Sequence, residues 1–249
     1  MRLIASLSAV QWVIAAACSL MAGLTKTGLP GLSTLVVPLF AEVLPARAST
    51  GALLPLLVLG DALAVLFYRR SAAWGHLVKL LPWAAAGIVI GYLVMGRIND
   101  RLMRPVLGAV VLLMLAGNLW RDLSTRGEAA VPTSLWFAAA AGLLAGVTTM
   151  IANAAAPVMM IYLLSMRLPK KEFIGTGAWF FFFVNWIKVP FSASLGLITA
   201  QSLLLDAVLA AGVIAGAVAG AFIARRIPEK AFAIVMQALT LAAAIRLFF

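Results

Sequence analysis

Eight apolar segments, separated by short polar connections, make up nearly the whole chain. They cover residues 8–40, 50–68, 77–96, 105–120, 134–166, 173–190, 202–224 and 230–248. A helix needs about 20 apolar residues to cross the roughly 30 Å hydrocarbon core of a bilayer, and the uninterrupted segments approach that length. Because backbone polar groups in lipid must be satisfied within the segment, helices are the expected form. The sequence therefore predicts an all-α integral membrane protein.

Charged side chains are few, and they are spread between the apolar segments. They make up 11% of the 249 residues, whereas soluble domains contain about 25%. The net charge is +11, but the basic residues form no continuous stripe of the kind that binds nucleic acid. Basic residues beside membrane spans typically set orientation and contact anionic lipid headgroups. Membrane lipid is therefore an expected partner, and nucleic acid is not.

Two of the segments are interrupted by glycine and polar residues. The first break covers residues 22–31 (AGLTKTGLPG), and the second covers residues 145–153 (AGVTTMIAN). We expect each broken segment to form two half-helices that are too short to cross alone, with the second halves starting near Leu32 and Ala154. They either re-enter or cross together, and the distribution of Lys and Arg slightly favours re-entrant hairpins. Paired breaks in the two halves of a membrane chain indicate a transport site.

Short sequence matches indicate that the chain is duplicated. Three pairs of segments match at a nearly constant offset of about 125 residues, as internal repeats of transporters do. The pairs are 22–25 with 145–148, 50–52 with 176–178, and 85–87 with 210–212. The prediction is a first membrane repeat over residues 1–121, a linker over 122–133, and a second, inverted repeat over 134–249. Glycines at four-residue spacing in the third segments predict tight helix packing inside each half rather than a dimer face.

The first break contains a charged residue, Lys26. A lysine near the bilayer centre costs at least about 2.5–3.5 kcal/mol on insertion scales. It is expected either to snorkel to the interface or to serve as the counter-charge of a bound anion. Unpaired amides at the start of the following half-helix also attract anions. The candidate anion ligands in this break are Thr25, Lys26, Thr27, Gly28, Gly31 and Leu32.

The second break offers a similar set of groups without a charge. Its candidate ligands are Thr148, Thr149, Asn153 and the half-helix start near Ala154. Asn185 and Lys188 are three residues apart and therefore share one helix face. Lys188 lies near the end of its segment, so it either snorkels or joins the site.

Asp61 and Asp206 are the acidic residues inside the predicted spans. Intramembrane carboxylates typically pair with a cation or carry a proton in coupled transporters. Asp61 lies in the middle of its segment and is the candidate coupling or ion-pair residue. Asp206 lies near the start of its segment and is expected at the interface.

The sequence offers little for enzyme chemistry. The single histidine, His76, is predicted in a loop, and the single cysteine, Cys18, lies in an apolar segment. No metal-ligand cluster, nucleotide-binding loop or nucleophile–base arrangement is present. We therefore expect no cofactor, no metal site and no enzymatic activity.

On residues 22–31, the repeated halves and the glycine-rich third segments, the chain resembles the TauE/SafE family of bacterial membrane anion transporters. The resemblance covers essentially the whole chain. The second break, with Asn153–Ala154–Ala155–Ala156–Pro157, is poorer in glycine than the first, which bears on substrate size. The resemblance implies movement of sulfite, sulfoacetate or a related small organosulfonate across the inner membrane, often as export. Direction and coupling ion do not carry over from it.

The sequence thus predicts a multi-pass secondary transporter of the bacterial inner membrane that moves a small oxyanion or organosulfonate by alternating access. Three alternatives remain open: an anion channel, an uptake permease for a small organic anion, and a membrane subunit that transports nothing. The expected partners are the anionic substrate, membrane lipid and a second copy of the chain.

Overall fold

The computed structural model describes residues 7–95, 134–228, 231–232, 234–235 and 238. In this part of the chain all regular structure is helical. The predicted segment 105–120, the predicted linker 122–133 and most of the predicted segment 230–248 lie outside the described residues. The described elements are α2 (Ala9–Thr27), η1 (Pro30–Leu32), α3 (Ser33–Phe40), α4 (Ala46–Tyr68), α5 (Trp74–Met95), α7 (Leu135–Ala152), α8 (Ala156–Ser165), α9 (Lys170–Ser194) and α10 (Ala200–Arg226).

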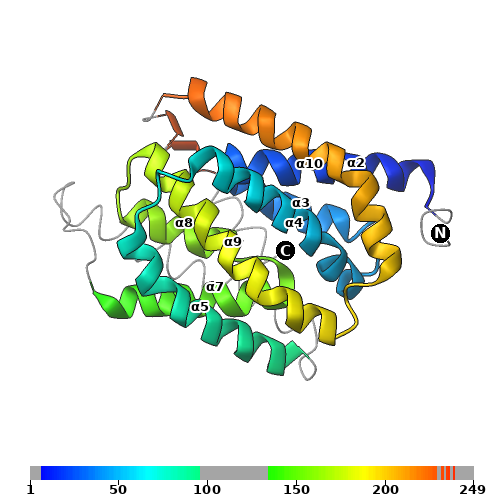
Figure 1. Cartoon of the computed structure of the whole chain (residues 1–249), viewed down its shortest axis with the longest axis horizontal. Coiled ribbons are helices and arrows are strands. Elements are labelled where there is room, and N and C mark those ends of the chain that lie inside the picture. The colour runs from blue at the N-terminus through cyan, green and yellow to red at the C-terminus, as the bar shows by residue number, and fades with distance from the viewer. Residues whose placement is uncertain (1–6, 96–133, 229–230, 233, 236–237, 239–249) are drawn as a thin grey trace.

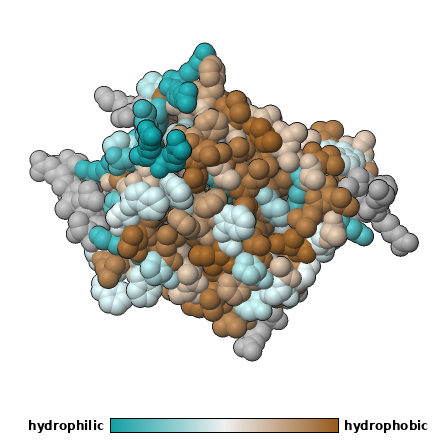
Figure 2. All heavy atoms as spheres, viewed as in Figure 1, coloured by the Kyte–Doolittle hydropathy of each residue, from teal (hydrophilic) through white to brown (hydrophobic). Residues whose placement is uncertain are grey.

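Five of these helices are long and apolar enough to cross a membrane: α2, α4, α5, α7 and α10. The protein is therefore a multi-pass, all-helical membrane protein in the part that the structure describes, as the hydropathy pattern predicts. Many large apolar side chains of α5 and α10 are exposed, among them Val78, Leu93, Val218 and Phe222. Apolar residues cover much of the face in Figure 2. Such a surface suits contact with lipid rather than with water.

The long helices pack in three pairs (Figure 1). The pair of α2 and α10 forms one side, the pair of α5 and α7 forms the other, and α4 and α9 lie between them. The two outer pairs approach closely at glycines. A Cβ at Gly216 would lie closer than 3.0 Å to the backbone of Leu20, and one at Gly146 would do the same to Ala84. Small residues are what permit such close approach of membrane helices.

These glycine contacts correct one prediction. The sequence pattern predicts that the glycines of the third segments pack inside their own halves. Instead, Gly87 and Gly91 of α5 face α7, and Gly216 and Gly220 of α10 face α2. Each contact therefore joins a helix of residues 1–121 to a helix of residues 134–249. The four-residue spacing identifies a packing face, but it carries no information about the partner helix.

The breaks in the two interrupted segments are narrower than predicted. Helix α2 continues to Thr27 and α7 to Ala152, so the gaps before the next helical residues are Gly28–Leu29 and Asn153–Ala155. The threonine hydroxyls permit this, because they donate to carbonyl oxygens one turn earlier: Thr25 Oγ1 lies 2.9 Å from Ala22 O. With 19 residues, α2 rises about 28 Å. The expectation that the first half of this broken segment is too short to cross a membrane was therefore wrong.

Each short helix runs back along the long helix before it. Gln11 Nε2 donates to Val43 O at 3.5 Å, and Cys18 Sγ donates to Val36 O at 3.8 Å, so α3 returns along α2. In the same way, the ring of Tyr162 near the end of α8 stacks on Phe137 near the start of α7, with centroids 5.6 Å apart. Both broken segments are thus helical hairpins whose tips are the two breaks.

Candidate functional site

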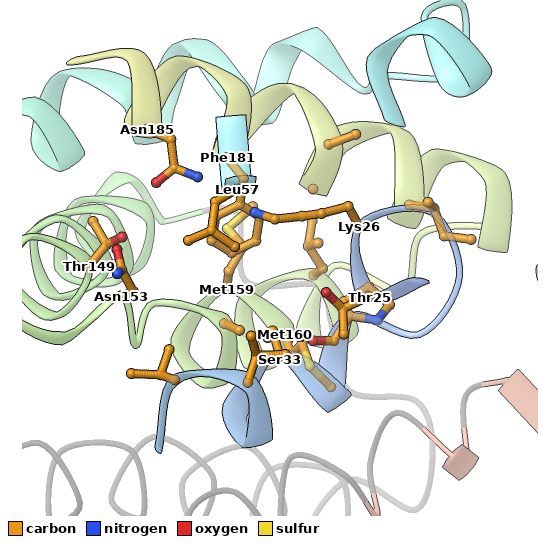
Figure 3. A pocket seen from close by; sticks show the side chains of 18 of the residues that line it. Thr25, Lys26, Ser33, Leu57, Thr149, Asn153, Met159, Met160, Phe181 and Asn185 are labelled. Carbon is orange, nitrogen blue, oxygen red and sulfur yellow. Dashed lines mark hydrogen bonds between the residues drawn. The ribbon is translucent and has the colours of Figure 1, made fainter. Parts of the chain in front are cut away.

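A cavity lies where the tips of the two hairpins meet the central helices α4 and α9 (Figure 3). The volume in which the centre of a water molecule can lie is about 40 Å³. A single bound water needs roughly 10–15 Å³ of such volume. The cavity therefore has room for a few waters or one small ion. Its polar lining comes from Thr25, Lys26, Ser33, Thr149, Asn153 and Asn185.

Lys26 reaches into this cavity and forms an ion pair there. Its Nζ lies 2.7 Å from Oδ1 of Asp61, which is fully buried on α4. Asn185 Nδ2 donates to the other carboxylate oxygen of Asp61 at 2.6 Å. The ammonium of Lys26 also lies 4.5 Å from the ring centroid of Phe181, a cation–π distance. The structure therefore places Lys26 inside the protein rather than snorkelling at a surface.

Lys188 is a second buried cation, 2% exposed, on α9. Its ammonium donates to Thr149 Oγ1 at 3.1 Å, to Asn153 Oδ1, and more weakly to Asn185 Oδ1 at 3.5 Å. Lys188 is absent from the cavity lining, but all three of its acceptor residues line it. Lys188 thus lies directly behind the polar wall, and the snorkelling alternative does not describe it.

Asn153 connects the second break to this wall. Its φ of 51° places it in the left-handed region, which asparagine tolerates better than most residues and which commonly ends helices. The amides of Asn153 and Ala154 donate back to Thr149 O and Thr148 O, which closes the end of α7. The side-chain Nδ2 donates to Thr50 O at 2.9 Å, so the amide oxygen faces Lys188.

Two substitutions of Asn153 separate its backbone role from its side-chain role. We expect Asn153→Ala to be about 1–2 kcal/mol less stable than Asn153→Gly, because only glycine accepts the left-handed conformation without a Cβ clash. Both variants lose the contacts to Lys188 and Thr50. Denaturation of the purified variants in detergent micelles measures the difference, and equal stabilities would contradict the assigned backbone role.

Several predicted site residues lie outside the lining. Thr27 Oγ1 donates to Ala217 O at 2.6 Å and so joins α2 to α10, and Thr148 Oγ1 donates to Ala145 O within α7. Gly28 packs against Gly220. Leu32 belongs to η1, and Ala154 belongs to the second break. Gly31 also belongs to η1, and its position relative to the lining is outside what the structure describes. The residues brought together are therefore Thr25, Lys26, Thr149, Asn153, Asn185, Lys188 and Asp61.

Asp206 does not join this cluster. It is 5% exposed on α10, and its carboxylate oxygens have no hydrogen-bond partner among the described residues. Asp206 is thus buried within the protein, and its place at the membrane interface stays a prediction.

The apolar wall of the cavity was not predicted. Leu57, Met159, Met160 and Phe181 line it opposite and between the polar groups (Figure 3). In a chain that is 64% hydrophobic, nothing in the sequence separates cavity-lining apolar residues from those that pack in the interior. The nearest sequence signal for this wall is the proline at residue 157. It fixes the start of α8, two residues before Met159.

The chain matches one known protein family over nearly its whole length. The sequence pattern of the family described as Sulfite exporter TauE/SafE matches residues 15–247. The chain belongs to this family. It is therefore a membrane transporter of the sulfite-exporter type, and as a member of a transporter family it is not expected to be an enzyme. No curated protein and no solved structure matches the TauE/SafE chain.

Proposed function

We propose that this TauE/SafE protein is a secondary transporter that exports a small oxyanion or organosulfonate across the bacterial inner membrane by alternating access. The observation that carries the proposal is the meeting of Lys26, Asp61, Asn185 and Lys188 around one small cavity at the hairpin tips. Buried charged groups in membrane helices are costly and typically mark substrate or ion pathways.

The helix directions support duplicated, inverted halves. Near the start of α4, Gly51 meets Leu197 just beyond the end of α9, while Ala73 beyond the end of α4 meets Thr176 near the start of α9. The two central helices are thus antiparallel, as equivalent helices of inverted repeats must be. Each half would contribute one hairpin and one central helix to the site, which would open to alternate sides of the membrane in turn.

The outer helix pairs also match each other under this duplication. Gly87 and Gly91 meet α7 at Leu143, Val147 and Met150. Gly216 and Gly220 meet α2 at the counterparts Leu20, Leu24 and Thr27. Under the proposed repeat, Gly87 therefore corresponds to Gly216, and not to Gly212 as the sequence match suggested.

Within the cavity, the anion would contact Lys26 and the polar groups of Thr25, Thr149, Asn153 and Asn185. Charge-assisted hydrogen bonds to an ammonium are stronger than neutral ones. Asp61 would hold Lys26 in place between transport events, and it remains the candidate coupling residue.

Anion flux into proteoliposomes tests the proposal. We expect Lys26→Ala to reduce sulfite or organosulfonate flux by about 10- to 100-fold, because a charge-assisted hydrogen bond worth about 1.5–3 kcal/mol is lost. Lys79→Ala, which removes an exposed lysine of α5, is the matched control and should transport normally. Thermal unfolding confirms that each variant is folded.

Three results would point elsewhere. Unchanged flux and affinity in folded Lys26→Ala protein would remove Lys26 from the site. Conduction without saturable counterflow, measured electrically, would identify an anion channel. Purified wild-type protein that neither binds nor moves any anion would favour a membrane subunit without transport activity.

A further inference from the structure

Lys26 lines the cavity, two further ionisable groups lie behind its wall, and the charges of the three do not cancel. Asp61 has Lys26 and Lys188 as its charged neighbours, and Lys188 has Lys26 and Asp61, among the described residues. Lys26 contacts Asp61 directly at 2.7 Å, and Asn185 bridges Asp61 to Lys188. Two ammonium groups face one carboxylate, so the ionised cluster carries one unbalanced positive charge.

The hydrogen bonds around Lys188 fit a charged ammonium. Asn185 must turn its Nδ2 toward the carboxylate of Asp61, and Asn153 must turn its Nδ2 toward Thr50 O, because both of those partners only accept. Both amides therefore present their oxygens to Lys188, and Thr149 Oγ1 is the third neighbour. Three oxygen acceptors match the three N–H donors of an ammonium group.

An unbalanced charge inside a membrane protein is costly, and one bound negative charge would neutralise it. A monoanion at Lys26 brings the cluster to zero. A dianion reverses the imbalance and leaves one excess negative charge in the same buried place. The charge count therefore favours monovalent over divalent anions.

Part of the lining is apolar. Leu57, Met159 and Phe181 lie around the Lys26 ammonium in the view of Figure 3, and Met160 lines another part of the cavity. A hydroxyl or a second charged group directed at these side chains would lose its hydration without gaining a partner. A methyl or ethyl substituent would lose nothing there.

We propose that this cavity selects monovalent anions that carry a small apolar substituent, such as a short alkanesulfonate, over divalent oxyanions. Lys26, Lys188 and Asp61 set the valence through their net charge, and the wall of Leu57, Met159, Met160 and Phe181 accepts the substituent. This inference rests on the proposed anion transport, but it makes a separate statement about which anions are taken.

Calorimetric binding of matched anions to the purified full chain tests the inference. Methanesulfonate and sulfate have nearly the same size, and they differ in valence because a methyl group replaces one charged oxygen. We expect the monoanion to bind on the order of 30-fold more tightly, because the bound dianion leaves one buried negative charge without a partner. Ethanesulfonate should also bind roughly tenfold more tightly than 2-hydroxyethanesulfonate, which adds one hydroxyl to the same chain.

A change of cluster charge should weaken the valence preference. In Asp61→Asn the cluster carries two unbalanced positive charges, so we expect the ratio of monoanion to dianion affinity to fall at least about tenfold. Asp206→Asn is the control, because it removes a buried carboxylate that lies outside the cluster. This variant should keep the wild-type ratio of monoanion to dianion affinity. If Asp61→Asn does not fold, the wild-type comparison still decides the inference.

The outcomes separate this inference from the proposed function. Equal or tighter binding of sulfate than of methanesulfonate to the wild type, with transport intact, overturns the monovalent selectivity and leaves anion transport standing. Equal binding of ethanesulfonate and its hydroxylated analogue overturns the proposed preference for an apolar substituent. Failure of the wild type to bind or move any of these anions, or sulfite, overturns the proposed function itself.

Discussion

Replacement of Asp61 by leucine is expected to lower the free energy of unfolding by about 3–5 kcal/mol, the usual cost of removing one partner of a buried ion pair. Asp61 is fully buried and contacts Lys26 at 2.7 Å. Its removal leaves Lys26 and Lys188 without a neighbouring negative charge among the described residues, and it removes the acceptor of Asn185 Nδ2. Reversible SDS unfolding of the purified protein, followed by tryptophan fluorescence, measures the loss.

Two control variants distinguish a lost ion pair from a general loss of packing. Lys26→Met combined with Asp61→Leu removes both charges, and it should recover most of the lost stability because apolar replacement of a whole buried pair is often neutral. Asp206→Leu makes the same chemical change at a buried carboxylate without a hydrogen-bond partner among the described residues. That variant should be neutral or stabilising, because an unpaired buried carboxylate is itself costly.

The three variants together give a sharp result. Asp61→Leu alone should be strongly destabilised, and the other two should lie close to the wild type. If Asp206→Leu were as damaging as Asp61→Leu, burial rather than pairing would explain both. If the double variant were no better than Asp61→Leu, the ion pair would not be the reason for the loss.

The sequence predicted the helical membrane architecture because hydropathy alone determines which segments can lie in lipid. It also identified Lys26, Asp61, Asn185 and Lys188, because a charged or amide group in an apolar segment is rare enough to stand out. It could not pair them. Lys26 and Asp61 lie on different helices, and no periodicity relates residues that are brought together only by tertiary packing.

Local hydrogen bonding explains where the predicted breaks were misplaced. Threonine and lysine at residues 25–27 looked like an unwound segment, but Thr25 satisfies its hydroxyl within the helix and Lys26 is compensated by Asp61 from another helix. The actual end of α7 depends on the left-handed backbone of Asn153. Asparagine is one of few residues that adopt that conformation readily, so this end could have been placed from the sequence.

Substitution of one glycine at each outer helix pair is expected to have a similarly large effect. A Cβ at Gly216 would overlap the backbone of Leu20, and one at Gly146 would overlap the backbone of Ala84. Backbone cannot yield as a flexible side chain can, so α10 must move away from α2, or α7 from α5. We expect Gly216→Ala and Gly146→Ala each to lose about 3 kcal/mol of unfolding free energy, the upper end of the usual range for overpacking.

The chain provides controls for this experiment within its own helices. A Cβ added at Gly75 of α5 would meet no atom within 4 Å, and one added at Gly177 of α9 would meet only a leucine methyl at 3.6 Å, among the described residues. Alanine at either position should stay within about 1 kcal/mol of the wild type, with helix propensity favouring alanine. If Gly216→Ala were tolerated as well as Gly75→Ala, the close approach of α2 and α10 would be wrong. If only one of the two interfaces were sensitive, the proposed equivalence of the two halves would fail, because inverted repeats predict the same packing constraint at both.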